Sequence, residues 1–274
     1  MAFHRTSVDM AFVEVVDGSP IVNFMSDAKM LQRGLMTTFY KATASSDGFI
    51  QKEARRIVAS WSYYDVLADM LAEFPSLELY LAGGALRDVV LNNRRPVQDL
   101  DLFFAGIEKE EIVGFLQTKG RVEDGPFGSP RWYAPEDTST YADVIPIRSF
   151  HNGLWQCFDI KDVLNQFDFT GNAISLHLRT WDICDPQNSL RDLSARVMRA
   201  VRFDFPDEVI SPQCPLTRLC VLWFRILHYA AELELSIEPV TKRWLAAHSS
   251  YESQASLFAR YFFTPNLSGV SAFR

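Results

Sequence analysis

Two aspartates separated by a single residue, Asp99 and Asp101, open an apolar stretch of the chain. Residues two apart in a β-strand lie on the same face, so the two carboxylates would project side by side while Leu100 faces the other way. Paired carboxylates supply the hard oxygen ligands that Mg²⁺ prefers, and phosphate oxygens can complete its shell. The plain alternative is a solvated strand face that carries two acids. The pair therefore indicates either a divalent-metal site or ordinary surface.

A pair of glycines, Gly83 and Gly84, follows an apolar run over 77–82 and precedes a helical pattern over 85–92. Backbone N–H groups at the junction of a strand and a helix can approach phosphate oxygens closely when no side chain intervenes. Arg87, one turn into the helix, could add positive charge to the same anion. The alternative is a tight turn without a ligand.

A third acid, Asp143, opens an apolar segment that ends at Arg148. A strand here, placed beside the first, would bring this carboxylate to the other two, where it could activate an attacking hydroxyl through a shared metal. Pro146 predicts an edge strand or a strand end, because proline cannot donate to the hydrogen-bond ladder of a sheet.

The elements that must position these residues are short strands and helices. Apolar runs bounded by turn residues indicate strands, and longer apolar stripes with helical spacing indicate helices. The expected strands are 77–82, 98–104, 131–133, 141–148 and a hairpin over 174–184. The expected helices in this part are a stretch over 49–74 that allows an interruption and that Pro75 ends, and the segments 85–92 and 108–119.

Helical patterns alone follow Asp185-Pro186, over 189–201, 216–233 and 239–262. Mixed strands followed by helices predict an α+β fold, with a small mixed sheet first and an all-helical region after it. We therefore expect an N-terminal extension over 1–60, an α+β domain over 61–184 and a helical region over 185–274. The extension contains a hairpin pattern over 11–24 and a helical pattern from about 26 to 44.

The composition fits an ordinary globular chain of 274 residues, with 48% apolar residues and a net charge of −7. This acidity argues against a surface coated in positive charge for gripping nucleic acid, although a local basic groove is compatible with it. No apolar run approaches the roughly 18 to 20 residues needed to span a membrane. The four cysteines lack disulfide-like or zinc-like spacing, so we expect reduced thiols and a cytoplasmic protein without membrane contact.

Taken in order, these segments resemble the catalytic head of the nucleotidyltransferase family that contains the CCA-adding enzymes and the bacterial poly(A) polymerases. The family's Gly-Gly-x-x-Arg-Asp loop, its Asp-x-Asp strand and its acid-Val-x-x-x-Arg strand match 83–88, 99–101 and 143–148. Two further segments, 166–173 and 192–199, resemble the family's Arg-Arg-Asp-Phe-Thr-x-Asn-Ala motif and the start of its neck. The resemblance spans roughly 77–245.

The resemblance implies transfer of a nucleoside monophosphate from a nucleoside triphosphate to a hydroxyl acceptor, with an RNA 3′ end as the expected acceptor and Mg²⁺ or Mn²⁺ as the cofactor. It implies that Asp99 and Asp101 hold both metals and that Asp143 ligates the metal that activates the acceptor. It assigns the triphosphate and the sugar or base side of the nucleotide to Gly83, Gly84, Arg87, Asp168 and Asn172. Asp88 is expected to be a structural partner of Arg87.

The chain departs from the family pattern in two places. Gln166 and Phe167 stand where the family has paired arginines, and an amide or a ring does not replace a bidentate guanidinium. The family reads the incoming base with Glu-Asp-x-x-Arg, where this chain has Arg218, Leu219 and Leu222; only Arg225 of the following arginines is clearly retained. We therefore do not expect the family's selection of C and then A.

The departures keep two other functions open. One is a nucleotide- or RNA-binding module without turnover. The other is nucleotidylation of a protein or a small molecule, because only 35 residues follow Pro239 and no counterpart of the family's RNA-gripping region is expected in them. The extension over 1–60 has no match in the family and is a candidate site for a protein partner. The arginines of 191–202 are expected to form structural ion pairs.

Overall fold

The computed structural model describes residues 10–16, 19–25, 48–61, 63–93, 99–125, 128–135 and 137–269. The chain divides into two units, Met1–Ile50 and Gln51–Arg274. In the first unit, β1 (Met10–Val16) and β2 (Ser19–Met25) pair antiparallel, so the predicted hairpin is confirmed. The predicted helix from 26 to 44 lies outside the described residues.

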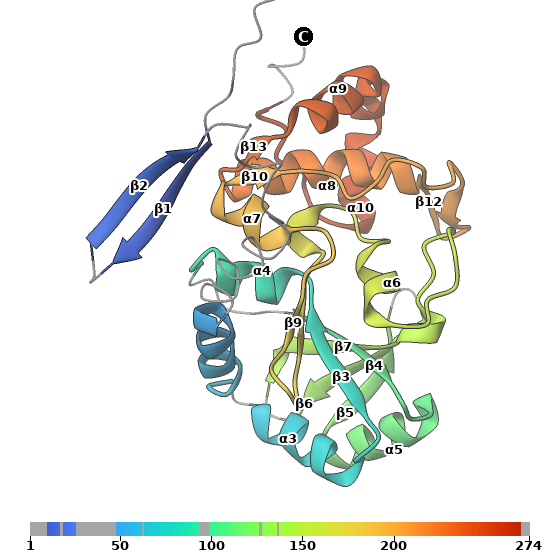
Figure 1. The fold of residues 1–274 in the computed structure, drawn as a ribbon. Coiled ribbons are helices and arrows are strands. Elements are labelled where there is room, and N and C mark those ends of the chain that lie inside the picture. Colours follow the sequence, from blue (N-terminus) through green and yellow to red (C-terminus); the bar gives the residue numbers. More distant parts are fainter. Residues whose placement is uncertain are drawn as a thin grey trace, which may run out of the picture. The chain divides into compact units, whose positions relative to one another are not determined.

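A seven-stranded mixed sheet organises the second unit (Figure 1). Its order is β5-β6-β7-β4-β3-β8-β9, and β4 and β7 run parallel whereas every other neighbouring pair is antiparallel. The mixed sheet that the sequence predicts is therefore confirmed. The strands are β3 (Glu78–Ala82), β4 (Asp99–Ala105), β5 (Arg121–Asp124), β6 (Pro130–Ala134), β7 (Asp137–Pro146), β8 (Ser175–His177) and β9 (Ile183–Cys184).

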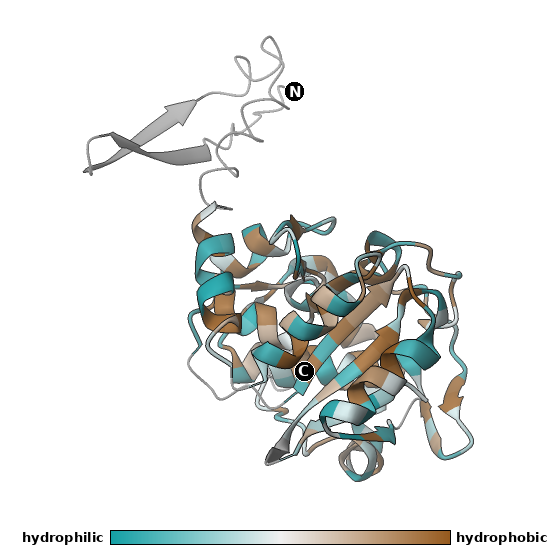
Figure 2. Cartoon of the chain, turned by 90° about the horizontal axis from the view of Figure 1, so that it is seen from below, coloured by the Kyte–Doolittle hydropathy of each residue, from teal (hydrophilic) through white to brown (hydrophobic). Residues whose placement is uncertain are grey.

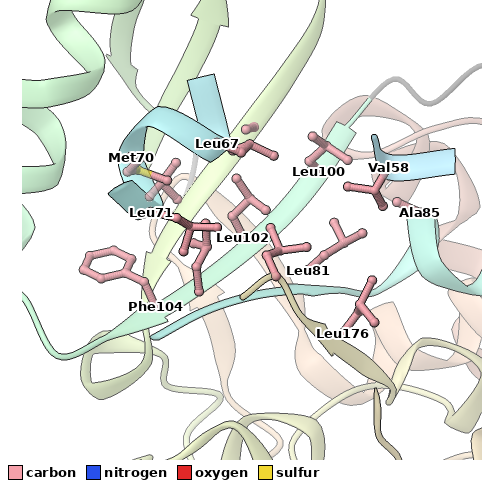
Figure 3. Packing of buried hydrophobic residues seen from close by; sticks show 14 of the residues in the cluster. Val58, Leu67, Met70, Leu71, Leu81, Ala85, Leu100, Leu102, Phe104 and Leu176 are labelled. Atoms are coloured by element: carbon pink, nitrogen blue, oxygen red, sulfur yellow. The ribbon is translucent and has the colours of Figure 1, made fainter. Parts of the chain in front are cut away.

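One face of this sheet packs against α3 (Tyr64–Glu73), α5 (Lys109–Lys119) and the helical residues 51–58. Figure 3 shows aliphatic side chains of the helices and the strands meeting in this layer. Alternation along β4 places Leu100, Leu102 and Phe104 in it, each almost fully buried. Burial of each such side chain contributes roughly 1.5–3 kcal/mol. This layer therefore fixes the register of the strand that carries the two acids.

The opposite face is apolar in one part and acidic in another. Ala82 and Phe103 pack there against α6 (Ile160–Leu164) and the 3₁₀ turn η1 (Ile147–Ser149). Asp99 and Asp101 occupy the same face of β4, toward its first residues. Pro146 is the last residue of β7, which lies between β6 and β4, so the predicted strand end is correct and the predicted edge strand is wrong.

The region after residue 184 is built mainly from helices around a core of its own. Trp223, Phe224 and Phe258 lie at its centre, fully buried. Its helices are α7 (Ser189–Ser194), α8 (Arg218–Glu232), α9 (Pro239–Ala247), the 3₁₀ helix η3 (Ser249–Gln254) and α10 (Ala255–Tyr261).

Two short strand pairs in this region were not predicted. The helix expected over 189–201 stops at Ser194, because Arg196 adopts a positive φ of 53° and the chain then pairs β10 (Val197–Met198) with β13 (Ser236–Ile237). A second pair, β11 (Val209–Ser211) and β12 (Cys214–Thr217), precedes α8. The side chain of Thr217 accepts a hydrogen bond from the Cys220 amide and so caps α8, which is why this helix begins at Arg218.

Residues 51–274 form one unit because short elements connect the sheet to the helical region. Figure 1 shows α4 (Gly84–Val90) between the sheet and α7, and the 3₁₀ turn η2 (Thr170–Asn172) contacts both helices. The division into 1–60, 61–184 and 185–274 stays a prediction. Figure 2 shows mostly apolar strands flanked by helices with one polar side. Within the described residues, no helix is long and apolar enough to cross a membrane.

Candidate functional site

The strand register places the two predicted acidic motifs next to each other. Asp101 on β4 is directly paired with Asp143 on β7 and, on its other side, with Ala82, the last residue of β3. Side chains of directly paired residues point to the same face of a sheet. Asp143 and Asp101 therefore share a face, and Asp99 lies two residues before Asp101 on that face.

Asp101 is the most electrostatically strained member of this group. Burial raises the pKa of its carboxyl to about 7, and the negative charges of Asp99 and then Asp143 add to the rise. No described group donates a hydrogen bond to it. A carboxylate with negative neighbours and no donor is stabilised by a cation, and its hard oxygens suit Mg²⁺. The donor chemistry of the three acids therefore fits a divalent metal.

The three acids are not arranged round an ion as they stand. Across the described part of the chain, no group of three or more His, Cys, Asp or Glu side chains has an arrangement that could hold one. Asp143 instead accepts two hydrogen bonds from Arg131 on β6, from Nε to Oδ1 at 2.8 Å and from Nη2 to Oδ2 at 2.9 Å. Both oxygens of this carboxylate are therefore engaged by a guanidinium.

Gly83 permits the close approach of the β3–α4 turn to Asp101. Its φ is 76°, a left-handed conformation, and a Cβ at this position would lie 2.5 Å from Oδ2 of Asp101. Only a residue without a side chain meets both conditions. Gly84, the first residue of α4, is less restricted, since its Cβ would lie 3.4 Å from Nη2 of Arg87.

The Gly83→Ala variant is expected to lose about 1–3 kcal/mol of folding free energy, because it combines an unfavourable φ with a contact that displaces the Asp101 carboxylate. Thermal unfolding followed by circular dichroism measures this loss. The matched control is Gly114→Ala, at an exposed helical position with nothing within 4 Å of the added Cβ. That variant is expected to gain roughly 0.5–1 kcal/mol. Equal stabilities of the two variants would contradict the role assigned to Gly83.

Arg87 is buried and its guanidinium is used inside the chain. Its Nη1 donates to Oδ1 of Asn172 at 2.7 Å, and its Nε donates to Asp88 at 3.0 Å. Its Cζ also lies 5.0 Å from the ring centroid of Tyr229 on α8. The expected pairing with Asp88 is confirmed, whereas a contact of Arg87 with triphosphate stays a prediction. The contacts in the structure tie α4 to η2 and to α8.

Asp168 belongs to the same network. It accepts from Nε of Arg225 at 2.6 Å and from Nδ2 of Asn172 at 3.2 Å. Burial is the largest single influence on the pKa of Arg225 and lowers it, but the charge and hydrogen bond of Asp168 and the charges of Tyr229 and Asp101 together outweigh burial, so the pKa is raised. Arg225 also lies over the ring of Tyr229, at 5.3 Å from its centroid. The structure therefore brings the two predicted nucleotide-contacting residues, Asp168 and Asn172, together beside a neck arginine.

Sequence reasoning missed Arg131. It stands twelve residues before Asp143 in a strand whose pattern carries no sign of a functional charge. Arg225, by contrast, was noticed as a retained family arginine, although its contact with Asp168 was not anticipated.

The two positions that depart from the family motif are structural here. Gln166 is fully buried, and its Nε2 donates to the carbonyl oxygen of Trp155 at 2.8 Å while its Oε1 accepts from the amide of Asn152 at 3.3 Å. Phe167 packs near the rings of Phe103 and Phe150. These positions therefore hold the loop before α6 in place and supply no positive charge.

The neck positions that would read a base also lack acids. Leu222 is buried and Leu219 packs against the helical core, while a Cβ on Gly153 would lie 3.5 Å from Cζ of Arg218. The arginines of α7 and the following turn form ion pairs, as expected: Arg191 and Arg199 both bind Asp192.

Comparisons with known proteins address the family directly. The chain is 31% identical over 173 residues to the multifunctional CCA protein of Xanthomonas euvesicatoria, and the match covers 57% of the chain and 39% of that protein. The chain thus spans less than half the length of this curated relative. No protein-family model matches it.

Solved structures of CCA-adding enzymes are similar to this chain in fold. A CCA-adding enzyme in complex with CTP has a TM-score of 0.57 at 17% identity, covering 76% of this chain and 49% of that one. The Thermotoga maritima CCA-adding enzyme complexed with tRNA has a TM-score of 0.54 at 19% identity, covering 71% and 44%. The chain therefore has the fold of the CCA-adding enzymes, and the resemblance to their family that its motifs indicated is confirmed.

Proposed function

We propose that the chain is a metal-dependent nucleotidyltransferase that moves a nucleoside monophosphate from a nucleoside triphosphate to an RNA 3′-hydroxyl. The observation that carries this proposal is the row formed by Asp143 and Asp101 on paired strands, with Asp99 on the same face. Sequence similarity to a multifunctional CCA protein supports the reaction class. Solved neighbours bound to CTP and to tRNA support the two substrates.

The residues that would hold Mg²⁺ or Mn²⁺ are Asp99, Asp101 and Asp143. When bound, the metal would neutralise the triphosphate and lower the pKa of the acceptor hydroxyl. Little covalent chemistry is left for the protein in such a transfer, so its residues act by positioning and by charge. Gly83 lets the β3–α4 turn lie directly against Asp101, and backbone N–H groups of a glycine pair at such a turn would be able to contact phosphate oxygens.

The nucleotide side of the site would be built by the network around Asp168. Its carboxylate is fixed by Arg225 and by Asn172, and Asn172 is fixed in turn by Arg87. These three hydrogen bonds hold the Asp168 carboxylate and the Asn172 amide in one orientation. Recognition of a sugar hydroxyl requires side chains that are oriented in this way. We propose that Arg87 acts on the nucleotide through Asn172 as well as through its charge.

The direct test is incubation of the purified chain with each of the four labelled nucleoside triphosphates, Mg²⁺ or Mn²⁺, and a short RNA. Label is expected on the RNA, to disappear when EDTA is added and when the RNA ends in a 3′-deoxynucleotide. The 3′-deoxy RNA is the matched control, since it differs in the acceptor hydroxyl alone. Absence of label from all four nucleotides with both metals would contradict the proposal. The preferred triphosphate is read from the same experiment.

A second candidate is a binding module without turnover. It is favoured by one specific observation: Arg131 engages both oxygens of Asp143, while Gln166 and Phe167 supply no guanidinium. Triphosphate binding by equilibrium dialysis without any transfer would support this alternative. Label on a protein acceptor and none on RNA would support nucleotidylation of a protein.

The cell compartment and a protein partner are part of the proposal as well. The free thiols of Cys157, Cys184, Cys214 and Cys220 fit the reducing cytoplasm that we expect. We retain residues 1–60 as the segment that would bind a protein partner.

A further inference from the structure

The carboxylate of Asp143, the third acid of the cluster, is held by the guanidinium of Arg131. Register pairs Arg131 on β6 with Asp143 on β7, and Asp143 with Asp101 on β4, so the three side chains form one row on one face of the sheet. The guanidinium meets the carboxylate with two parallel hydrogen bonds of 2.8 and 2.9 Å. Both side chains are about four-fifths buried, with 19% and 21% of their surface exposed. This geometry is the strong, bidentate form of an ion pair.

Neighbouring rings keep the guanidinium in this position. Cζ of Arg131 lies 3.8 Å from the ring centroid of Tyr141, which precedes Asp143 by two residues on the same face of β7. The ring of Tyr141 packs in turn against Tyr133, at 5.8 Å between centroids. A planar guanidinium that stacks on a ring and makes two hydrogen bonds to a carboxylate has little conformational freedom left. The side chain of Arg131 is therefore held firmly in this position.

The charges of the site are distributed unevenly as a result. Arg131 pairs with Asp143, and Arg225 pairs with Asp168. No described cation makes an ion pair with Asp99 or Asp101. Among the described residues, a divalent ion entering the cluster thus meets two carboxylates without an ion pair and one that is already held by Arg131.

We propose that Arg131 competes with divalent metal for Asp143, so that it is a positioning residue that keeps the third acid off the metal until at least one of its two hydrogen bonds is released. Asp99 and Asp101 form the resting metal site, and Asp143 joins it only after this release. The competition weakens metal binding compared with what three free carboxylates would give, because the guanidinium occupies both oxygens of the third ligand.

The test measures metal binding directly, by electron paramagnetic resonance of free Mn²⁺ during titration of the full chain. Arg131→Gln is expected to lower the apparent dissociation constant at least about fivefold. The matched control is Arg121→Gln, since Arg121 is another strand arginine, stacked on Tyr133 and paired with Glu123, but it touches no acid of the cluster. The control is expected to change the constant less than about twofold.

A second comparison separates competition for the ligand from simple charge repulsion. In the Asp143→Asn background, Arg131→Gln is expected to change the Mn²⁺ constant less than about twofold, because the contested ligand is gone. If circular dichroism shows that Arg131→Gln folds poorly, Arg131→Lys replaces it, with an expected tightening of at least about twofold since lysine cannot form the fork.

The role of Arg131 rests on the proposed function, because that function identifies the three acids as the metal site. The Mn²⁺ titrations give different results when the role of Arg131 is wrong and when the metal-dependent function is wrong. Unchanged or weaker Mn²⁺ binding by Arg131→Gln would overturn the inference alone and would mean that Arg131 prepares Asp143 for the metal. Absence of Mn²⁺ binding by the unmodified chain would overturn the metal-dependent function itself, and the inference with it.

Discussion

Asp101→Asn is expected to lower the rate of nucleotide transfer at least about 10³-fold while the chain remains folded. The asparagine keeps the shape of the side chain but removes one of the two carboxylates that form the resting part of the proposed metal site. A neutral amide binds Mg²⁺ far more weakly, and the charge stabilisation that the metal gives to the transferring phosphoryl group is lost with it. Steady-state transfer to a labelled RNA at saturating triphosphate measures the effect.

The control for this variant is Asp69→Asn. Asp69 is an exposed aspartate on α3 that pairs with Lys119 at 2.8 Å, outside the acidic row. Its replacement is expected to leave transfer within about twofold of the unmodified chain. A loss of less than tenfold in Asp101→Asn would mean that transfer does not pass through the metal site that we propose.

The same Asp101→Asn substitution is expected to stabilise the fold, and to do so only above acidic pH. The pKa of Asp101 is about 7 in the folded chain and 3.8 for the unperturbed group. Between these values the folded chain holds a proton that the unfolded chain has lost, so the wild-type stability falls as the pH rises from about 4 to 7. Asparagine has no such proton, so this loss does not occur in the variant.

The size of the gain follows from the two pKa values. The variant is expected to be more stable by about 1–4 kcal/mol at pH 8, and the difference is expected to vanish near pH 4. Urea unfolding in EDTA at both pH values measures it. Asp99→Asn is the matched comparison, because Asp99 is exposed and its removal relieves less strain. A variant that is less stable at pH 8, or equally shifted at both pH values, would contradict the raised pKa.

The sequence predicted the shared face of Asp99 and Asp101 because that part of the acidic row depends on local rules. Alternation along β4 fixed which of its residues face the core, and Asp99 and Asp101 followed from the same alternation. The β3–α4 turn was readable from the Gly83-Gly84 pair. The resemblance then supplied the neighbouring strand of Asp143, which no local rule could pair with β4.

The role of Arg131 and the strand β10 could not be predicted from the sequence, because both depend on contacts between distant segments. Arg131 acquires its meaning only from the pairing of β6 with β7. The predicted helix over 189–201 failed for a similar reason: β10 is stabilised by pairing with β13, about forty residues later, and Arg196 must turn left-handed to reach it. Helical periodicity within 189–201 contains no information about that partner.

Tyr229 has a consequence for how this chain can be divided in the laboratory. Its ring contacts Arg87 from the sheet side and Arg225 from its own helix, at 5.0 and 5.3 Å. A fragment that ends at residue 184 would leave the buried guanidinium of Arg87 without this aromatic cover and Asp168 without its arginine. Exposing the Arg87 charge and leaving the Asp168 charge without its partner both cost folding free energy. Such a fragment would therefore lose the arrangement of side chains that it was made to isolate. A fragment made to study this site should therefore extend at least through α8.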